Sequence, residues 1–376
     1  MISTEDLQIT YFQQEPYSKC VDYVAINDST LFVVHPEMGL MKLTIGFNNW
    51  SYADIKQQST PNNYFEIAGS QINELAYGHG ILAATSGYKM YNNGYTDMYL
   101  ANASINYFEN EEWHHISERD ILKMPLAGKE FRGITNVACD PSTPHRFYVS
   151  TLTTGLYQFD KDSLTQHFLP KTNIKSVHVD DDGILWVAKS LNDSTIWSYD
   201  PSSNEWTYHN ISDFSQVSNV GRLFRQKYEQ HRLIWAVNNY PYRKSRIGIL
   251  YNTTAIKGNT KDDQSAHFTT FQDQDGNQYS LATTINTVYD IQEDREGKIW
   301  LLTNIGPFVV DDVTEAFNYA QQNPGIGLVK RIKVPRNDGT NLADYLLSTT
   351  ACTALVTDKD LYRCGWCQPQ MDRHFR

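Results

Sequence analysis

A Cys-x-x-Cys pair near the C-terminus has the spacing of a redox or metal-binding motif. Cys364 and Cys367 enclose Gly and Trp, and His374 follows as a third candidate ligand. A thioredoxin-type pair opens a helix after a strand, and a structural zinc site needs four ligands. The sequence around the pair shows no βαβ pattern, so we expect neither a redox site nor a metal site. The remaining cysteines are expected to be small buried residues on inner strands: Cys20, Cys139 and Cys352.

Two runs of carboxylates are the next candidates, because carboxylate oxygens are calcium ligands. One run is Asp180–Asp182 before a glycine, and the other contains Glu293, Asp294 and Glu296. An EF-hand loop places its ligands at alternate positions and ends on a later Glu, and neither run has that spacing. We expect these carboxylates to bond backbone groups of tight turns. The sequence therefore predicts no metal and no cofactor.

The motifs of common hydrolases are missing from the sequence. It contains no G-x-S-x-G, no H-E-x-x-H and no phosphate-binding loop. His79, His114 and His115 have no partners at metal-ligand spacing. We therefore expect no enzyme, although a catalytic site assembled from distant loops would not show as a local motif.

Net charge and hydropathy exclude two classes of partner. The formal net charge is -11 and no cluster of Lys and Arg opposes it, so a nucleic-acid backbone is not an expected ligand. No run of about 18 apolar residues is present, so no segment is expected to span a membrane. The first residues lack the basic and apolar regions of a signal peptide.

The elements that carry these residues repeat along the chain. Asn173–Ser190 and Thr287–Asn304 both read as an apolar run, an acidic turn that ends in Gly, and a second apolar run containing Trp. This pattern is typical of a β-hairpin, in which Gly takes a positive φ and Trp is packed. The shared positions are Asp180, Gly183 and Trp186 in the first copy, and Asp294, Gly297 and Trp300 in the second.

Weaker copies extend the pattern over most of the chain. They are Cys20–His35, Asn73–Thr85, Thr135–Ser150, Gly221–Asn238 with Trp235, and Ala351–Asp358. Repeats of roughly 40 to 65 residues, each with several short strands, are typical of β-propeller blades. We predict an all-β propeller of about six to seven four-stranded blades over residues 1–358 as a single domain; the short seventh copy leaves an incomplete last blade open. Residues 359–376 lack strand alternation and are expected to lie outside the regular fold.

Segments between the copies receive separate predictions. Met1–Gln14 shows weak alternation and is interpreted as a closing outer strand. Helix is expected only near Glu118–Met124 and Leu342–Leu347, whereas Ile305–Asn318 should continue the sixth blade. Pro324–Leu328 is interpreted as a loop, and the segment that begins at Arg331 and ends at Pro335 as a strand.

The chain after the sixth copy resembles a known family. Its repeat is similar to the two-component-regulator propeller repeat of Bacteroidetes proteins. The run IGPFVVDDVTEAFN, and VPRNDGTNLADYLL at Val334–Leu347, resemble the PorZ-like proteins of the type IX secretion system. The resemblance covers Gly133–Asp358. The chain departs from the family after Asp358, where KDLYRCGWCQPQMDRHFR replaces the next blade motif and suggests a truncated or frameshifted reading frame.

The resemblance implies a function for the parent protein. Family members are exported, carry a second propeller, and bind anionic lipopolysaccharide beside a cell-surface sortase. We therefore expect a non-catalytic binding module at the periplasm or cell surface, with lipopolysaccharide and attachment-complex proteins as partners. Two alternatives stay open: a periplasmic glycan-sensing propeller of a hybrid two-component system, and a polysaccharide lyase or hydrolase propeller.

Aromatic and basic residues outside the repeat template are the candidate ligand-binding residues. An aromatic ring can stack on a sugar, and the guanidinium fork of Arg suits a carboxylate or phosphate. The candidates are Tyr240, Tyr242, Arg243, Lys244, Arg246 and Arg336. For Arg336 the alternative is a structural role, tying its loop to a neighbour.

Overall fold

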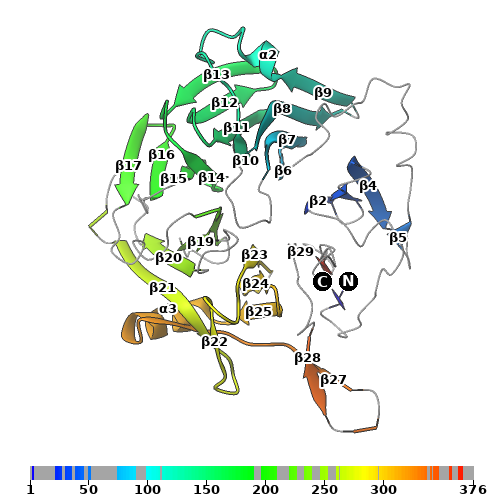
Figure 1. The fold of residues 1–376 in the computed structure, drawn as a ribbon, viewed down its shortest axis with the longest axis vertical. Coiled ribbons are helices and arrows are strands. Elements are labelled where there is room, and N and C mark those ends of the chain that lie inside the picture. The colour runs from blue at the N-terminus through cyan, green and yellow to red at the C-terminus, as the bar shows by residue number, and fades with distance from the viewer. Residues whose placement is uncertain are drawn as a thin grey trace, which may run out of the picture.

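The structure of the chain is a computed structural model. It describes residues 2–3, 22–27, 30–35, 39–45, 50–51, 74–89, 99–110, 112–189, 196–209, 220–226, 233–238, 246–252, 260–261, 263–294, 296–336, 339–340, 342–346, 355–357 and 363–366. Most of these residues are strands, and Figure 1 shows their sheets arranged around a common centre. No helix in this described part is long and apolar enough to cross a membrane.

The first four sheets of the ring are antiparallel and four-stranded. The first comprises β2 (Asp22–Asn27), β3 (Thr30–His35), β4 (Gly39–Ile45) and β5 (Trp50–Ser51). The second comprises β6 (Glu74–Gly78), β7 (Ile81–Lys89), β8 (Tyr99–Glu109) and β9 (Glu112–Ser117). The third comprises β10 (Ile134–Cys139), β11 (Arg146–Thr151), β12 (Leu156–Asp160) and β13 (Ser163–Phe168). The fourth comprises β14 (Ile174–Val179), β15 (Leu185–Lys189), β16 (Ile196–Asp200) and β17 (Glu205–His209).

The fifth and sixth sheets depart from this plan. The fifth comprises β18 (Arg222–Arg225), β19 (Leu233–Asn238), β20 (Arg246–Asn252), β21 (Asp263–Gln272) and β22 (Gln278–Ser280), and β26 (Gly325–Leu328) pairs in parallel with β21. The sixth has three strands, β23 (Val288–Glu293), β24 (Ile299–Thr303) and β25 (Gly306–Val310). After β25 the chain therefore leaves its own blade and returns to the edge of the preceding one.

Helix α3 (Val313–Gln322) makes this crossover, where the sequence predicted more of the sixth blade. That prediction is wrong beyond β25. Asp312 caps the helix by accepting a hydrogen bond from the backbone N–H of Glu315, as N-terminal Asp does. The buried residues Val313, Ala316, Phe317 and Ala320 recur at helical spacing and form one apolar face. Both signals are present in the sequence, and the repeat template obscured them.

Two further local predictions are corrected in this region, and two are confirmed. The predicted loop after Pro324 is strand β26, held by its parallel pairing with β21. The predicted helix at Leu342–Leu347 contains strand β28 (Ala343–Tyr345), because it pairs with β27 (Lys333–Pro335). The predicted strand that ends at Pro335 is therefore correct, and α2 (Glu118–Ile121) confirms the short helix predicted there.

Strands from both ends of the chain form the seventh sheet of the ring. β29 (Leu355–Thr357) pairs with β30 (Arg363–Trp366), which pairs with β1 (Ile2–Ser3). The expectation that residues 359–376 lie outside the regular fold is therefore corrected at the four residues of β30; the rest of that segment lies outside the described residues. The strand is specified by pairing partners on both sides, and not by a local alternation of side chains.

The repeat tryptophans pack between neighbouring blades. Trp186 on the fourth sheet shares a buried cluster with Leu223 and Ile234 of the fifth. Trp235 on the fifth sheet is fully buried with residues of the sixth, including Phe308. Trp300 is 6% exposed. The recurring Trp is therefore a core residue of the ring, as the template predicts.

Candidate functional site: the inner-strand cluster and the hairpin anchor

The acidic repeat positions cap their own hairpin turns. One carboxylate oxygen of Asp180 accepts from backbone N–H groups two and four residues later, at 3.0 and 2.9 Å, and the other accepts from Trp186 Nε1 at 2.9 Å. Asp294 makes the same three bonds, with Trp300 Nε1 at 2.8 Å. Gly183 has a φ of 76°, the left-handed conformation this turn requires. In the described part of the chain no cluster of three metal-ligating side chains occurs.

The turn of the fifth sheet lacks this carboxylate. Gln226 occupies the equivalent position, since its backbone N–H donates to Leu233 O at 3.0 Å. Its side chain donates to Gly297 O of the neighbouring turn at 2.9 Å. Gln226 Oε1 and Trp235 Nε1 are both buried without a hydrogen-bond partner among the described residues. The turn of the fifth sheet therefore lacks the hydrogen bond to its own Trp and instead bonds the turn of the sixth sheet.

These contacts predict different costs for Trp-to-Phe substitutions. Trp186→Phe and Trp300→Phe each remove a bond to a carboxylate, buried in the case of Asp180 and partly buried in the case of Asp294, which we expect to lower the free energy of unfolding by about 1.5–3 kcal/mol. Trp235→Phe removes an N–H that has no partner, so its cost should be smaller by at least about 1 kcal/mol. Urea unfolding of the three variants measures this difference. Equal losses in all three would contradict the role assigned to the carboxylates.

A buried chain of three side chains between the fourth and fifth sheets was missed by sequence reasoning. Ser198 Oγ lies 2.8 Å from His209 Nε2, and His209 Nδ1 lies 2.7 Å from Asp263 Oδ2. The order is that of a serine-hydrolase triad. All three side chains are more than nine-tenths buried. No sequence motif could reveal the chain, because its members come from three strands of two sheets.

Charged residues on the inner strands form a second buried network. Arg222 Nη1 lies 3.4 Å from Glu74 Oε2, and Arg222 Nη2 lies 3.1 Å from Asp290 Oδ1. Asn136 Nδ2 donates to the same Glu74 oxygen at 3.1 Å, and Asn136 Oδ1 accepts from the backbone N–H of Val177 at 3.1 Å. The network therefore links the second, third, fourth, fifth and sixth sheets at their inner strands.

Burial makes the Glu74 carboxyl the titratable centre of this network. Desolvation raises the pKa of Glu74 above its ordinary value, although Arg222 and Asn136 act in the opposite direction. A carboxyl whose pKa is higher in the folded state binds protons more tightly there. Its stabilising contribution is therefore complete below the unfolded value of 4.5 and is lost as pH rises through the folded pKa.

We expect Glu74→Gln to remove this pH dependence. As pH rises above 4.5, the wild-type unfolding free energy should fall relative to that of the variant, because the folded-state pKa lies above that value. The carboxyls whose pKa is lowered, such as Asp344 beside Arg336, titrate below 3.8 and do not share this window. Denaturant unfolding at several pH values checks the prediction, and parallel curves would contradict it.

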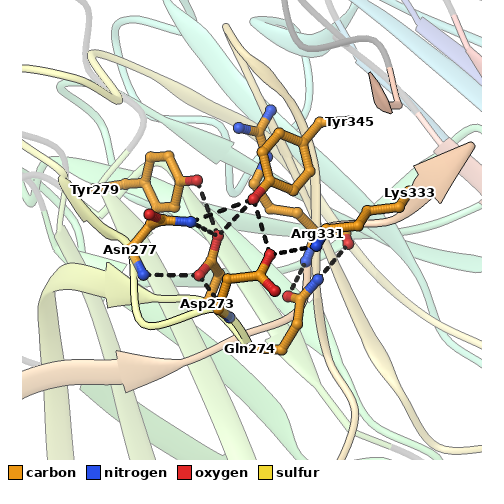
Figure 2. A network of polar contacts seen from close by, with 8 residues as sticks. Asp273, Gln274, Asn277, Tyr279, Arg331, Lys333 and Tyr345 are labelled. Carbon is orange, nitrogen blue, oxygen red and sulfur yellow. Dashed lines mark hydrogen bonds and ion pairs between the residues drawn. The ribbon is translucent and has the colours of Figure 1, made fainter. Parts of the chain in front are cut away.

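A third network anchors the hairpin of β27 and β28 to the fifth sheet (Figure 2). Tyr345 of β28 donates to Asp275 Oδ2 at 3.0 Å, and Asp273 Oδ2 accepts from Tyr279 at 2.9 Å. Lys333 of β27 forms an ion pair with Asp275 at 2.6 Å. Hydrogen bonds from Lys333 and Tyr345 hold the pKa of Asp275 below its ordinary value.

Arg331 lies at the centre of this hairpin anchor. Its guanidinium lies 4.3 Å from the ring centre of Tyr345 and 5.2 Å from those of Tyr279 and Phe308. It donates to Ile305 O at 2.8 Å and is 7% exposed. Gln274 exchanges two hydrogen bonds with the backbone of Arg331, each of 2.9 Å. A buried Arg stacked on aromatic rings is a rigid joint between the hairpin and the ring.

The structure places only part of the predicted ligand set. Tyr240, Tyr242, Arg243 and Lys244 lie outside the described residues. Arg246 is the first residue of β20 in the fifth sheet and is half-buried. Arg336 lies on the hairpin, where it binds Asp344 through two hydrogen bonds of 2.7 and 2.5 Å. For Arg336 these bonds match the structural alternative, within the hairpin itself.

The cysteines and histidines are placed in structural contacts. Cys139 is half-buried, and desolvation raises the pKa of its thiol to about 12. Cys364 lies in β30, whereas Cys20, Cys352, Cys367 and His374 lie outside the described residues. His79 bonds the carbonyl of Pro141 in the next turn, His114 stacks on Tyr107, and His115 lies 2.9 Å from Asn106 Oδ1.

Comparison with known proteins supports the fold and one repeat. The two-component regulator propeller family matches residues 284–304, which span the second repeat copy. No curated protein matches the chain. PorZ, a bacterial surface component of the type IX secretion system of Porphyromonas gingivalis, is similar in structure, with 19% identity and a TM-score of 0.61. The match covers 92% of this chain and 44% of PorZ.

Two other solved structures show the range of functions on this fold. The extracellular domain of a hybrid two-component system of B. thetaiotaomicron has 12% identity and a TM-score of 0.54, over 94% of this chain and 39% of that one. An ancestral GH74 enzyme has 12% identity and a TM-score of 0.55, over 89% and 44%. At these identities the likeness establishes a β-propeller and not an activity. The chain spans less than half the length of each of these three proteins.

Proposed function

We propose that this chain is a non-catalytic recognition propeller of a bacterial envelope protein, related to PorZ. The observation that carries the proposal is the segment between β25 and Leu346. This segment does not form a fourth blade strand; it crosses to the fifth sheet through α3 and β26 and then forms an anchored hairpin. Additions to a repeated scaffold are where binding functions concentrate. This segment also carries the sequence resemblance to the PorZ-like family.

The proposed location is the periplasm or cell surface, and the proposed partners are lipopolysaccharide and attachment-complex proteins. The similar structures of a secretion-system surface component and of the extracellular domain of a hybrid two-component system support that location. An acidic chain needs local positive groups to bind an anionic glycan, and the neighbouring basic residues Arg243, Lys244 and Arg246 supply three such groups.

Titration with lipopolysaccharide fractions tests the glycan part of this proposal. We expect saturable binding at low salt that weakens at high salt, because exposed charges are screened within about 10 Å at 0.1 M ionic strength. The triple variant Arg243→Ala, Lys244→Ala, Arg246→Ala should bind more weakly. Arg336→Ala serves as a matched control, because that guanidinium is already bonded to Asp344. If the affinity for lipopolysaccharide changed neither with salt nor in the triple variant, these residues would not form the glycan site.

A hydrolase is the second candidate, favoured by the geometry of Ser198, His209 and Asp263. The burial of all three side chains argues against it, since a nucleophile must reach its substrate. In a recognition propeller, these three hydrogen-bonded side chains would serve only to join the fourth and fifth sheets. A fluorophosphonate probe distinguishes the two: labelling of the native protein that disappears in Ser198→Ala would favour the hydrolase. A glycan sensor of a two-component system stays a third alternative, supported by the extracellular-domain neighbour.

A further inference from the structure

We infer that the outer edge of β28 is a docking site for an extended segment of a partner protein, added to the hairpin as a third strand. The inference rests on the proposed recognition function and names how a protein partner would be held. A two-stranded hairpin is only marginally stable by itself. This one projects from the ring in Figure 1, and within the described residues its two strands pair only with each other.

The backbone of β28 is oriented for strand addition. Arg336 N–H bonds Leu342 O, and Leu346 N–H bonds Ile332 O, both at 2.8 Å. Hydrogen-bonded pairs alternate along an antiparallel ladder, so the backbone groups of Ala343 and Tyr345 point away from β27. Two N–H and two C=O groups therefore face outward on one edge, as a template that another strand can pair with.

The opposite edge of the hairpin is less suited to this pairing. Its outward positions are Lys333 and Pro335, which lie opposite Tyr345 and Ala343. Pro335 has no backbone N–H, so a strand added along β27 would lose a ladder bond. The asymmetry selects β28 as the edge that a partner would occupy.

The charges and apolar surface of the hairpin indicate the chemistry of the partner. Arg336 is paired with Asp344, and Lys333 with Asp275, so these described charged groups of the hairpin are already matched within the chain. Leu342, directly before β28, is 56% exposed. An apolar residue of an added strand could cover Leu342 without leaving a charge unpaired. The expected occupant is an uncharged, extended segment with alternating apolar side chains.

The anchor makes the edge rigid enough to bind. Tyr345 is fixed at its hydroxyl by Asp275, and its ring stacks on buried Arg331. A strand template held in one geometry loses less conformational freedom when a partner pairs with it. This explains why the chain builds a polar and aromatic network under a hairpin that contributes no blade to the ring.

Amide hydrogen exchange of the full chain tests the site directly. The probe is an end-capped, uncharged hexapeptide, Thr-Val-Thr-Val-Thr-Val, which offers an alternating strand without identifying a natural partner. At a peptide concentration of about four times Kd, we expect exchange at Ala343 and Tyr345 to slow about five-fold. Ala343→Pro removes an outward N–H but no bond of the hairpin, and should abolish the protection.

Two further variants keep this test decisive. Leu342→Ser alters an exposed side chain, so the protein should fold normally and bind the peptide more weakly. Pro335→Ala changes only the opposite edge and should bind as wild type does. Protection that survives Ala343→Pro, or no protection at any concentration, would overturn the docking site.

A dimer in sedimentation that Ala343→Pro abolishes would instead make a second copy the occupant. Lipopolysaccharide titration is independent of these variants, so failure here is distinguishable from failure of the glycan proposal.

Discussion

Trp235→Ala is expected to lower the free energy of unfolding by about 3–5 kcal/mol. Trp235 is fully buried in the cluster that joins the fifth and sixth sheets, where its ring lies 6.1 Å from that of Phe268. Truncation leaves a cavity between two rigid sheets, which can collapse only partly. Denaturant unfolding monitored by circular dichroism measures the loss.

Tyr208→Ala provides the matched control for this substitution. Tyr208 is an aromatic strand residue of the ring, but it is 43% exposed. Its truncation should therefore cost about 1 kcal/mol or less. If Trp235→Ala and Tyr208→Ala destabilised the protein equally, Trp235 would not be packing between the blades. A Trp235→Ala variant that kept its stability but lost ligand binding would show that Trp235 belongs to a binding site and not to the core.

Arg222→Met should be the second most damaging change, with a loss of about 3 kcal/mol. The guanidinium compensates two carboxylates at once, and Asp290 is only 4% exposed. Without Arg222 these carboxylates are left partly or wholly buried beside each other, which is costly even though Met fills similar volume. The value lies at the lower end of the range for buried pairs, because Arg222 is 28% exposed.

Two comparisons separate this electrostatic effect from lost packing. Arg132→Met removes an exposed pair with Glu130 and should change stability by less than about 0.5 kcal/mol. The double variant Arg222→Met, Glu74→Gln should recover part of the loss, since one of the two stranded charges is removed. Additive losses in the double variant would show that Glu74 and Arg222 do not interact.

The repeated hairpins could be predicted from the sequence because their signals are local. The alternation of apolar residues, the Asp and Gly of the turn and the single Trp all lie within about 18 residues in each clear copy. The structure confirms the turn role of Asp180 and the burial of Trp186.

The prediction was wrong after β25 because the repeat pattern outweighed a different local signal. The Asp312 cap and the helical spacing of Val313, Ala316 and Phe317 are present in the sequence, yet their position after β25 favoured a fourth strand. The prediction for the segment of β28 was wrong for the opposite reason. Its segment has no strong strand signal, and pairing with β27 decides its conformation.

The candidate sites could not be predicted, because their members are distant in the chain. Glu74 and Arg222 are 148 residues apart, and Tyr345 lies 70 residues from Asp275. No spacing rule connects such positions; the circular arrangement of the blades brings them together. For Arg336, the sequence left an anion site and a structural contact both open, and the structure shows the guanidinium bonded to Asp344.

The sequence by itself determined the blades: short-range periodicity, turn chemistry and a packed Trp are properties of neighbouring residues. The tertiary structure alone decided how the ring closes and what it carries. β1 and β30 meet in one sheet, although they come from opposite ends of the chain. Arg222 forms ion pairs with carboxylates on two other sheets, and the hairpin of β27 and β28 is bonded to the fifth sheet. Burial and pairing energies depend on which surfaces meet, and that is fixed only when the whole chain has folded.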